Sequence, residues 1–315
     1  MHNFRTQDSA RVKNNYSESS LGTFYAISAF VLWGILPVYW KLLHAVPAGE
    51  ILAHRIFWSA VFVVLVLLYS GRKNFLTLLL DFRKRISLIL TGALIGINWF
   101  TYIYAVHTDR IVEASMGYYI NPLISIFLGL LVLKERLDRI QWIALILAMV
   151  GVLFVTYHFG RIPWIALVLS VTFGFYGLIK KIMNLDALSS LGVETLLLAP
   201  IAGGFIVVQA VKGTGSFLTA EFSATGLLLF SGAITAIPLY WFAQGARRIP
   251  LSRIGFLQYI APTLMLLIGV IGYSEPFTAI HTVSFGFIWT ALALYTLSLI
   301  RKSRYVENPI RQKKK

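Results

Sequence analysis

The 315-residue chain contains no cysteine, and it contains few charged residues of any kind. The absence of cysteine excludes disulfides and thiolate metal sites, but it does not indicate a redox compartment. Charged residues make up 13% of the chain and hydrophobic residues 57%. A soluble fold would be left with far more apolar surface than it could cover. The composition therefore predicts an integral membrane protein.

Several motifs of catalytic and energy-coupled proteins are also missing from the sequence. We find no phosphate-binding glycine loop with its lysine, no pair of histidines four residues apart, and no nucleophile elbow. We therefore expect no metal, no cofactor and no enzymatic activity, and an ATP-driven pump is disfavoured.

What the sequence contains instead is ten apolar segments of about 20 residues, the length that crosses a hydrocarbon core of roughly 30 Å as a helix. This predicts an all-α fold with ten transmembrane helices. The helices are expected near residues 21–40, 49–70, 86–106, 111–133, 139–158, 161–180, 187–210, 223–246, 252–273 and 279–300. The polar segment 1–20 lacks an apolar core, which predicts a tail and not a cleavable signal peptide.

An internal repeat organises these segments. Residues 21–160 align with residues 161–300 at a fixed offset of 140, without a gap. Identities in this register include Pro122 with Pro262 and Gly92 with Gly232, which chance does not favour. Five spans in each half mean that the second half must cross the membrane in the opposite direction. We predict two inverted repeats of five helices each.

The basic residues indicate how the chain is oriented. The formal net charge is +15, and together with the basic tail 301–315 it would suggest nucleic acid in a soluble protein. If the N-terminus is placed inside, however, 23 of the 28 basic residues fall on the cytoplasmic side. This is the positive-inside pattern. We therefore expect both termini in the cytoplasm and no nucleic-acid partner.

Inverted repeats are typical of secondary transporters, whose substrate site lies near the midplane between the two halves. Polar and helix-breaking residues inside the spans are the candidates for that site. In the fourth span, Glu113, Gly117 and Asn121 lie on one face, and Pro122 frees a backbone carbonyl. The ninth span repeats the pattern with Gln258, Tyr259 and Pro262. These prolines either kink the helices for packing or mark a cavity, and the two interpretations are compatible.

Aromatic and amide side chains in the third and eighth spans suit a planar or amphipathic organic solute. The candidates are Asn98, Trp99 and Tyr102 in the third span and Gln244 in the eighth. Trp99 and Tyr102 fit a pocket and an interfacial aromatic belt equally well. For Trp40, near the end of the first span, we expect the belt.

Ionisable residues lie one to two turns inside the second and seventh spans. Arg55 can hold an anionic substrate or a fixed carboxylate such as Glu113, and His54 or Glu194 can carry a coupling proton. The alternative is structural: Arg55 extends to the outer headgroups, and the others form an ion pair.

Five stretches resemble one family of bacterial permeases. They are 50–59 (EILAHRIFWS), 98–105 (NWFTYIYA), 113–122 (EASMGYYINP), 232–239 (GAITAIPL) and 252–263 (SRIGFLQYIAPT). The chain closely resembles the RarD family, in the EamA branch of the drug/metabolite transporter superfamily. The resemblance covers about residues 20–300. It implies ten helices in two EamA repeats and a cavity lined mainly by the first, third, fourth, sixth, eighth and ninth helices.

By position, the resemblance adds candidates for substrate binding. The set it implies is Trp33, Asn98, Tyr102, Tyr118, Asn121, Tyr176, Gln244, Gln258 and Tyr259. The sequence departs from the expected pattern at His107 and Met265, where we expect Asn and Gln.

The leading hypothesis is a secondary transporter of small organic metabolites or drugs in the bacterial inner membrane, working by alternating access. Export and proton coupling are compatible with it, and the sequence does not indicate the oligomeric state. The alternative is a membrane-embedded enzyme acting on a lipid-linked substrate, which requires Glu113, His54 and Glu194 to converge.

Overall fold

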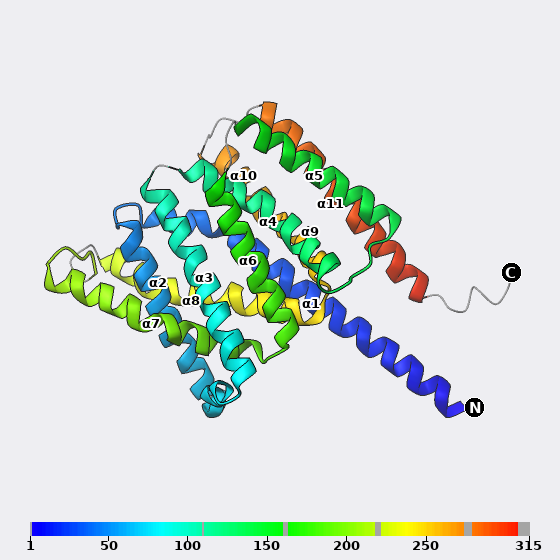
Figure 1. Ribbon diagram of the computed structural model, residues 1–315, viewed down its shortest axis with the longest axis horizontal. Helices are drawn as coiled ribbons and strands as arrows, with labels where there is room; N and C mark the ends of the chain where they lie inside the picture. Colours follow the sequence, from blue (N-terminus) through cyan, green and yellow to red (C-terminus); the bar gives the residue numbers. More distant parts are fainter. Residues whose placement is uncertain (1, 109, 160–162, 218–221, 274–278, 308–315) are drawn as a thin grey trace.

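The structure is a computed structural model that describes residues 2–108, 110–159, 163–217, 222–273 and 279–307. All regular secondary structure in these ranges is helical (Figure 1). The elements are α1 (His2–Leu42), α2 (Ala48–Tyr69), η1 (Lys73–Leu79), α3 (Phe82–His107), α4 (Ile111–Leu131), α5 (Arg139–Phe159), α6 (Trp164–Met183), α7 (Ala187–Val211), α8 (Phe222–Arg248), α9 (Leu251–Gln258), α10 (Ile260–Leu267), η2 (Ile268–Gly272) and α11 (Ala279–Glu307).

The helices confirm an all-α membrane protein. Within the described residues, eight helices are long and apolar enough to cross a membrane. They are Glu18–Leu42, Ala48–Tyr69, Arg139–His158, Trp164–Met183, Ala187–Val211, Ala224–Arg248, Leu251–Gly272 and Thr282–Arg301. A shorter apolar helix, Met116–Leu131, lies in α4. Each of the ten predicted spans contains helix in its described residues, but the count of ten membrane crossings stays a prediction.

Three features differ from the expected layout. The predicted tail 1–20 continues α1 as a helix from His2, because no proline or glycine interrupts the chain before Gly22. It extends away from the bundle in Figure 1. At the other end, α11 runs past residue 300 to Glu307. The ninth span is divided after Gln258, because Pro262 has no N–H to donate to the carbonyl of that residue. In contrast, α4 runs through Pro122 without a break.

The packing of the helices follows the 140-residue offset. At this offset α1 corresponds to α6, α2 to α7, α3 to α8, α4 to α9 and α10, and α5 to α11. The contact of α1 with α8 has its counterpart in that of α6 with α3, and α4 with α6 has its counterpart in α10 with α1. The pairs α2 with α7 and α5 with α11 are their own counterparts, and the second pair lies side by side along one edge (Figure 1). An internal pseudo-two-fold axis predicts this pattern.

The crossing of α2 and α8 depends on Gly232. A Cβ atom there would overlap the backbone carbonyl of Trp58 and lie 2.6 Å from the backbone nitrogen of Ser59. The Ser59 hydroxyl also donates to the Gly232 carbonyl at 3.0 Å. At Gly92, the counterpart in the other half, the nearest atom is 3.8 Å away. Gly232 therefore permits the close approach of the two backbones, whereas Gly92 leaves room for a methyl group.

The turn from α6 to α7 is fixed by an N-cap. Asn184 has a left-handed backbone with φ of 44°, and the Asp186 carboxylate accepts from the backbone N–H of Ser189 at 2.9 Å. Arg72 pairs with the same carboxylate at 2.6 Å. Partial burial alone would raise the pKa of Asp186, but the hydrogen bonds from Ser189 and the Arg72 charge outweigh it and hold the pKa below its ordinary value.

Candidate functional site

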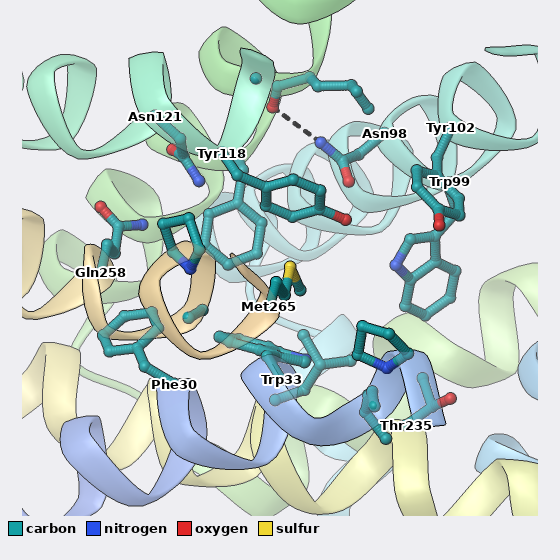
Figure 2. A pocket seen from close by; sticks show the side chains of 18 of the residues that line it. Phe30, Trp33, Asn98, Trp99, Tyr102, Tyr118, Asn121, Thr235, Gln258 and Met265 are labelled. Atoms are coloured by element: carbon teal, nitrogen blue, oxygen red, sulfur yellow. Dashed lines mark hydrogen bonds between the residues drawn. The ribbon is translucent and has the colours of Figure 1, made fainter. Parts of the chain in front are cut away.

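A central cavity of about 310 Å³ lies among α1, α2, α3, α4, α6, α8, α9 and α10. This volume is at the lower end of the roughly 300–1,000 Å³ that is usual for small-molecule pockets. Its lining residues are Phe30, Trp33, Leu36, Pro37, Trp40, Arg55, Ile95, Asn98, Trp99, Tyr102, Gly117, Tyr118, Asn121, Leu169, Phe173, Thr235, Leu239, Gln258, Ala261, Pro262 and Met265. Figure 2 shows the principal side chains.

One wall of the cavity is a group of contacting aromatic rings. The Trp33 ring lies 5.6 Å from that of Phe30 and 5.5 Å from that of Phe173, measured between centroids. The buried Phe242 ring packs behind them, 5.0 Å from Phe173. Trp33 and Phe173 are separated by the repeat offset of 140. Residues related by a two-fold can touch only close to the axis, so this contact is what the predicted repeat requires if its axis passes through the cavity.

Arg55 supplies the positive charge of the cavity. Its guanidinium lies 4.6 Å from the Trp40 ring and 5.4 Å from the Trp99 ring, distances at which a cation is attracted to an aromatic face. Its Nε donates to the Thr235 hydroxyl at 3.1 Å. Among the described residues, no carboxylate lies within ion-pair distance of it. Arg55 therefore faces the cavity, and Trp40 lies on the cavity wall; its place in an interfacial belt stays a prediction.

The amides of Asn121 and Gln258 form another part of the wall. Gln258 is only 4% exposed, yet neither its Oε1 nor its Nε2 has a hydrogen-bond partner among the described protein atoms, and the same holds for Oδ1 of Asn121. In Figure 2 the two amides point toward each other at one side of the cavity. Buried polar atoms normally find a partner, so these are available to a solute or to water.

The position of Gln258 is set by a cap on its helix. Glu135 accepts from the backbone N–H groups of Leu251 and Ser252, at 2.7 and 2.8 Å, in the first turn of α9. A carboxylate there is favoured by the helix dipole. The cap fixes the first turn of the eight-residue helix α9, and Gln258 is the last residue of that helix. The helix break caused by Pro262 comes immediately after Gln258.

Three prolines also leave backbone acceptors beside the cavity. A proline cannot donate to the carbonyl four residues earlier. For Pro37 and Pro262, which line the cavity, those carbonyls belong to Trp33 and Gln258. For Pro122, which is buried behind the wall, the carbonyl belongs to Tyr118.

Asn98 has a structural task as well as a place on the wall. Its Nδ2 donates to the Leu169 carbonyl at 2.8 Å, as drawn in Figure 2, and to the Thr172 hydroxyl at 2.9 Å. Both acceptors are on α6, so this amide joins α3 to α6. The Asn98 amide nitrogen therefore already donates to protein acceptors, whereas the Gln258 amide nitrogen has no acceptor among the described protein atoms.

Three sequence candidates for substrate binding lie outside this cavity. Tyr176 is fully buried and stacks on Phe242 with centroids 6.0 Å apart. Tyr259 is fully buried in a separate apolar cluster, and Gln244 donates to the Tyr240 hydroxyl at 2.8 Å. Of the substrate candidates, Trp33, Asn98, Trp99, Tyr102, Tyr118, Asn121 and Gln258 line the cavity.

Glu194 belongs to a buried ion pair. Its Oε1 lies 2.7 Å from Lys180 Nζ and accepts from the Thr91 hydroxyl at 2.6 Å, with both charged side chains at most 4% exposed. Lys180 also donates to the Ser190 hydroxyl at 2.9 Å. Lys180 is one of the 23 basic residues that the positive-inside pattern counts on the cytoplasmic side, but its side chain is buried in protein, where this carboxylate neutralises it.

His54 lies in a second buried group, at the position that corresponds to Glu194. Its Nδ1 accepts from Trp58 Nε1 at 3.0 Å, and its Nε2 lies 3.9 Å from a carboxylate oxygen of Glu50. Glu50 in turn accepts from the backbone N–H groups of Ser216 and Phe217. His54 and Glu194 contact different residues, whereas the enzyme alternative requires these two side chains to converge with Glu113. The side chains of Glu113 and His107 lie outside the described residues.

Sequence reasoning missed much of the apolar wall. Phe30, Leu36, Ile95, Leu169 and Leu239 look like ordinary span residues, and nothing in the sequence separates their cavity face from a lipid face. One sequence feature could have indicated Thr235: it is a polar residue inside a span, one turn before Pro238.

Comparison with known proteins places this geometry in context. The model of the EamA-like transporter family matches residues 20–157, close to the first predicted repeat. The chain is 45% identical to the transporter YojE of Bacillus subtilis, covering 92% of this chain and 98% of that protein. It is 43% identical to the protein RarD of Salmonella typhi, covering 90% and 97% respectively. A crystal structure of another protein has a TM-score of 0.68 at 18% identity, covering 88% of this chain and 97% of that chain, a likeness of fold alone.

Proposed function

Because this chain belongs to the EamA-like transporter family, as a RarD-type permease, we propose that it moves small organic solutes across the bacterial inner membrane by alternating access. The two halves, 21–160 and 161–300, act as inverted repeats about a shared central site, with both termini in the cytoplasm. The observation that carries the proposal is the central cavity, whose wall contains the contact of Trp33 with Phe173, two residues 140 positions apart.

The composition of the cavity supports an organic solute. Its aromatic wall offers stacking area, and Asn121, Gln258 and Arg55 offer a few orienting polar groups. The helix contacts that correspond at the 140-residue offset, such as α1 with α8 and α6 with α3, support the mechanism. In an inverted repeat, each half can adopt the conformation of the other, and the same site is then exposed to the other side of the membrane.

Alternating access can be tested by cysteine accessibility, since the chain has no native cysteine. Gln258→Cys, at the cavity, is expected to react with a membrane-impermeant thiol reagent from either side, but from one side at a time. Ile126→Cys serves as the control, because Ile126 is fully buried away from the cavity. Reaction of Gln258→Cys from a single side under all gradients would refute the mechanism.

Transport itself is tested in proteoliposomes with a panel of metabolites and amphenicol drugs. We expect saturable uptake that Gln258→Leu impairs without changing the folded yield. Unimpaired transport in this variant would refute the site assignment.

Proton coupling is a separate proposal, with His54 and Glu50 as its candidate groups. The buried pair has two atoms without a hydrogen bond among the described residues, His54 Nε2 and Glu50 Oε2. An imposed pH gradient is expected to change the transport rate, and His54→Gln to abolish that response. A rate that does not respond to the gradient in the wild type would exclude coupling.

A further inference from the structure

The positive charge of Arg55 in the cavity has no carboxylate within ion-pair distance among the described residues. Among the described lining residues, Arg55 is the one charged side chain, and the remainder carry aliphatic, aromatic, hydroxyl and amide groups and the thioether of Met265. A cation in a low-dielectric site is costly unless an anion accompanies it. The charge of Arg55 therefore favours the binding of an anion in this cavity and disfavours the binding of a second cation.

The guanidinium of Arg55 is also positioned to bind an anion through hydrogen bonds. Of its five N–H groups, the one on Nε is used by Thr235, and the described atoms supply no acceptor for the two terminal Nη groups. Trp40 and Trp99 flank it at 4.6 and 5.4 Å and restrict its movement. Two terminal N–H groups held in one plane match the two oxygens of a carboxylate.

The second polar region lies away from this cation. In Figure 2, Trp99 and Thr235, which contact Arg55, lie at one side of the cavity, and Asn121 and Gln258 lie at the other. Tyr118, Met265 and the Trp33 ring lie between them. Gln258 offers both donor and acceptor atoms without protein partners, so it suits a neutral hydrogen-bonding group.

We propose that the substrate is a small aromatic monocarboxylate whose far end carries a hydrogen-bonding group such as a hydroxyl. Arg55 binds the carboxylate, the rings of Trp33, Phe30 and Phe173 pack on the aromatic body, and Gln258 with Asn121 binds the far end. The inference rests on the proposed function, because it assigns the substrate class of the same cavity. A single guanidinium neutralises one negative charge, which favours a carboxylate over a phosphate monoester.

Four probes that share one aromatic scaffold separate the contributions. They are para-hydroxyphenylacetate, its neutral amide, the cation tyramine, and phenylacetate without the hydroxyl. Binding is measured by thermal shift on the purified protein, since a ligand of the folded state stabilises it by mass action. We expect para-hydroxyphenylacetate to bind about tenfold or more tightly than its amide, and tyramine not to bind.

Two variants locate the effect. Arg55→Gln is expected to weaken carboxylate binding about tenfold or more and to leave amide binding unchanged, while Arg55→Lys retains part of the preference. Gln258→Leu is expected to lower the affinity for para-hydroxyphenylacetate to that for phenylacetate. If Arg55→Gln does not fold, the wild-type probe series and Arg55→Lys decide the question.

The inference is overturned if the amide or tyramine binds the wild type as well as the carboxylate does. It is also overturned if neither carboxylate binds at millimolar concentration, or if Arg55→Gln weakens all probes equally. None of these results would change the expected outcome of the cysteine-accessibility test. A transporter with another substrate class would still expose Gln258→Cys alternately to both sides, so the two failures are distinguishable.

Discussion

Removing the carboxylate of Glu194 is expected to destabilise the protein by about 3–5 kcal/mol, because it leaves the Lys180 ammonium buried without a counter-charge. The two groups are 2.7 Å apart and are 1% and 4% exposed. With an effective dielectric constant of about 20, their attraction at this distance is about 6 kcal/mol. Desolvation of the two ions, several kcal/mol each, offsets most of that gain. The pair therefore contributes little net stability, although either charge alone is costly.

A double-mutant cycle separates these two statements. Glu194→Gln should cost about 3–5 kcal/mol, and Lys180→Met less, because the Thr91 hydroxyl still donates to the remaining carboxylate at 2.6 Å. The double variant should unfold within about 2 kcal/mol of the wild type, which gives a coupling energy of at least about 1 kcal/mol in addition to the cost of Lys180→Met alone. The free energy of unfolding is measured by titrating mixed micelles with a denaturing detergent.

The exposed pair of Asp81 and Lys84 provides the matched control. Its charged atoms are 3.6 Å apart, and the side chains are 47% and 44% exposed. Asp81→Asn should therefore change stability by less than about 1 kcal/mol. If the single variants at Glu194 and Lys180 are additive in the double variant, the two charges do not interact in the folded protein and the reasoning is wrong.

Three further changes test other parts of the structure. Asp186→Asn keeps a capping oxygen but loses the attraction to Arg72 and to the helix dipole, so it should cost at most about 1 kcal/mol at neutral pH. Since the folded pKa of Asp186 is below its ordinary 3.8, the carboxylate's contribution exists above that value and disappears as pH falls through the folded pKa, where wild type and variant should unfold alike. Gly232→Ala should lower the melting temperature because its methyl group meets backbone, whereas Gly92→Ala should not; equal effects would contradict the packing argument. Asn98→Ala should lower both stability and transport, while Gln258→Leu lowers transport alone, as measured by thermal unfolding and uptake.

The helices and their order follow from the sequence because lipid imposes a simple rule. A span must satisfy its own backbone hydrogen bonds and present apolar side chains, so length and hydropathy locate it. The same rule makes Pro122 and Pro262 visible, since a proline inside a span frees a backbone carbonyl that lipid cannot satisfy. These two signals predict the fold and one region of the cavity.

The remaining features depend on contacts between distant residues. Gln258 and Tyr259 are adjacent and both carry a hydrogen-bonding group, yet a turn of about 100° directs the first to the cavity and the second into an apolar cluster. Arg55 meets Thr235, which lies 180 positions away. Trp40 looks like a belt residue by its depth alone. Whether such a side chain faces the cavity depends on the rotation of its helix about its own axis, which packing against the neighbouring helices determines.

The contact between Trp33 and Phe173 has a consequence for the resting state of the transporter. If the two halves exchange conformations as we propose, each of these residues takes the surroundings that the other now has. An indole and a phenyl ring differ in volume and cannot fill both places equally well. The two access states therefore differ in packing free energy at this pair, which contributes to the choice of the side that the empty protein faces. The composition-neutral exchange Trp33→Phe with Phe173→Trp would reverse the sign of that contribution.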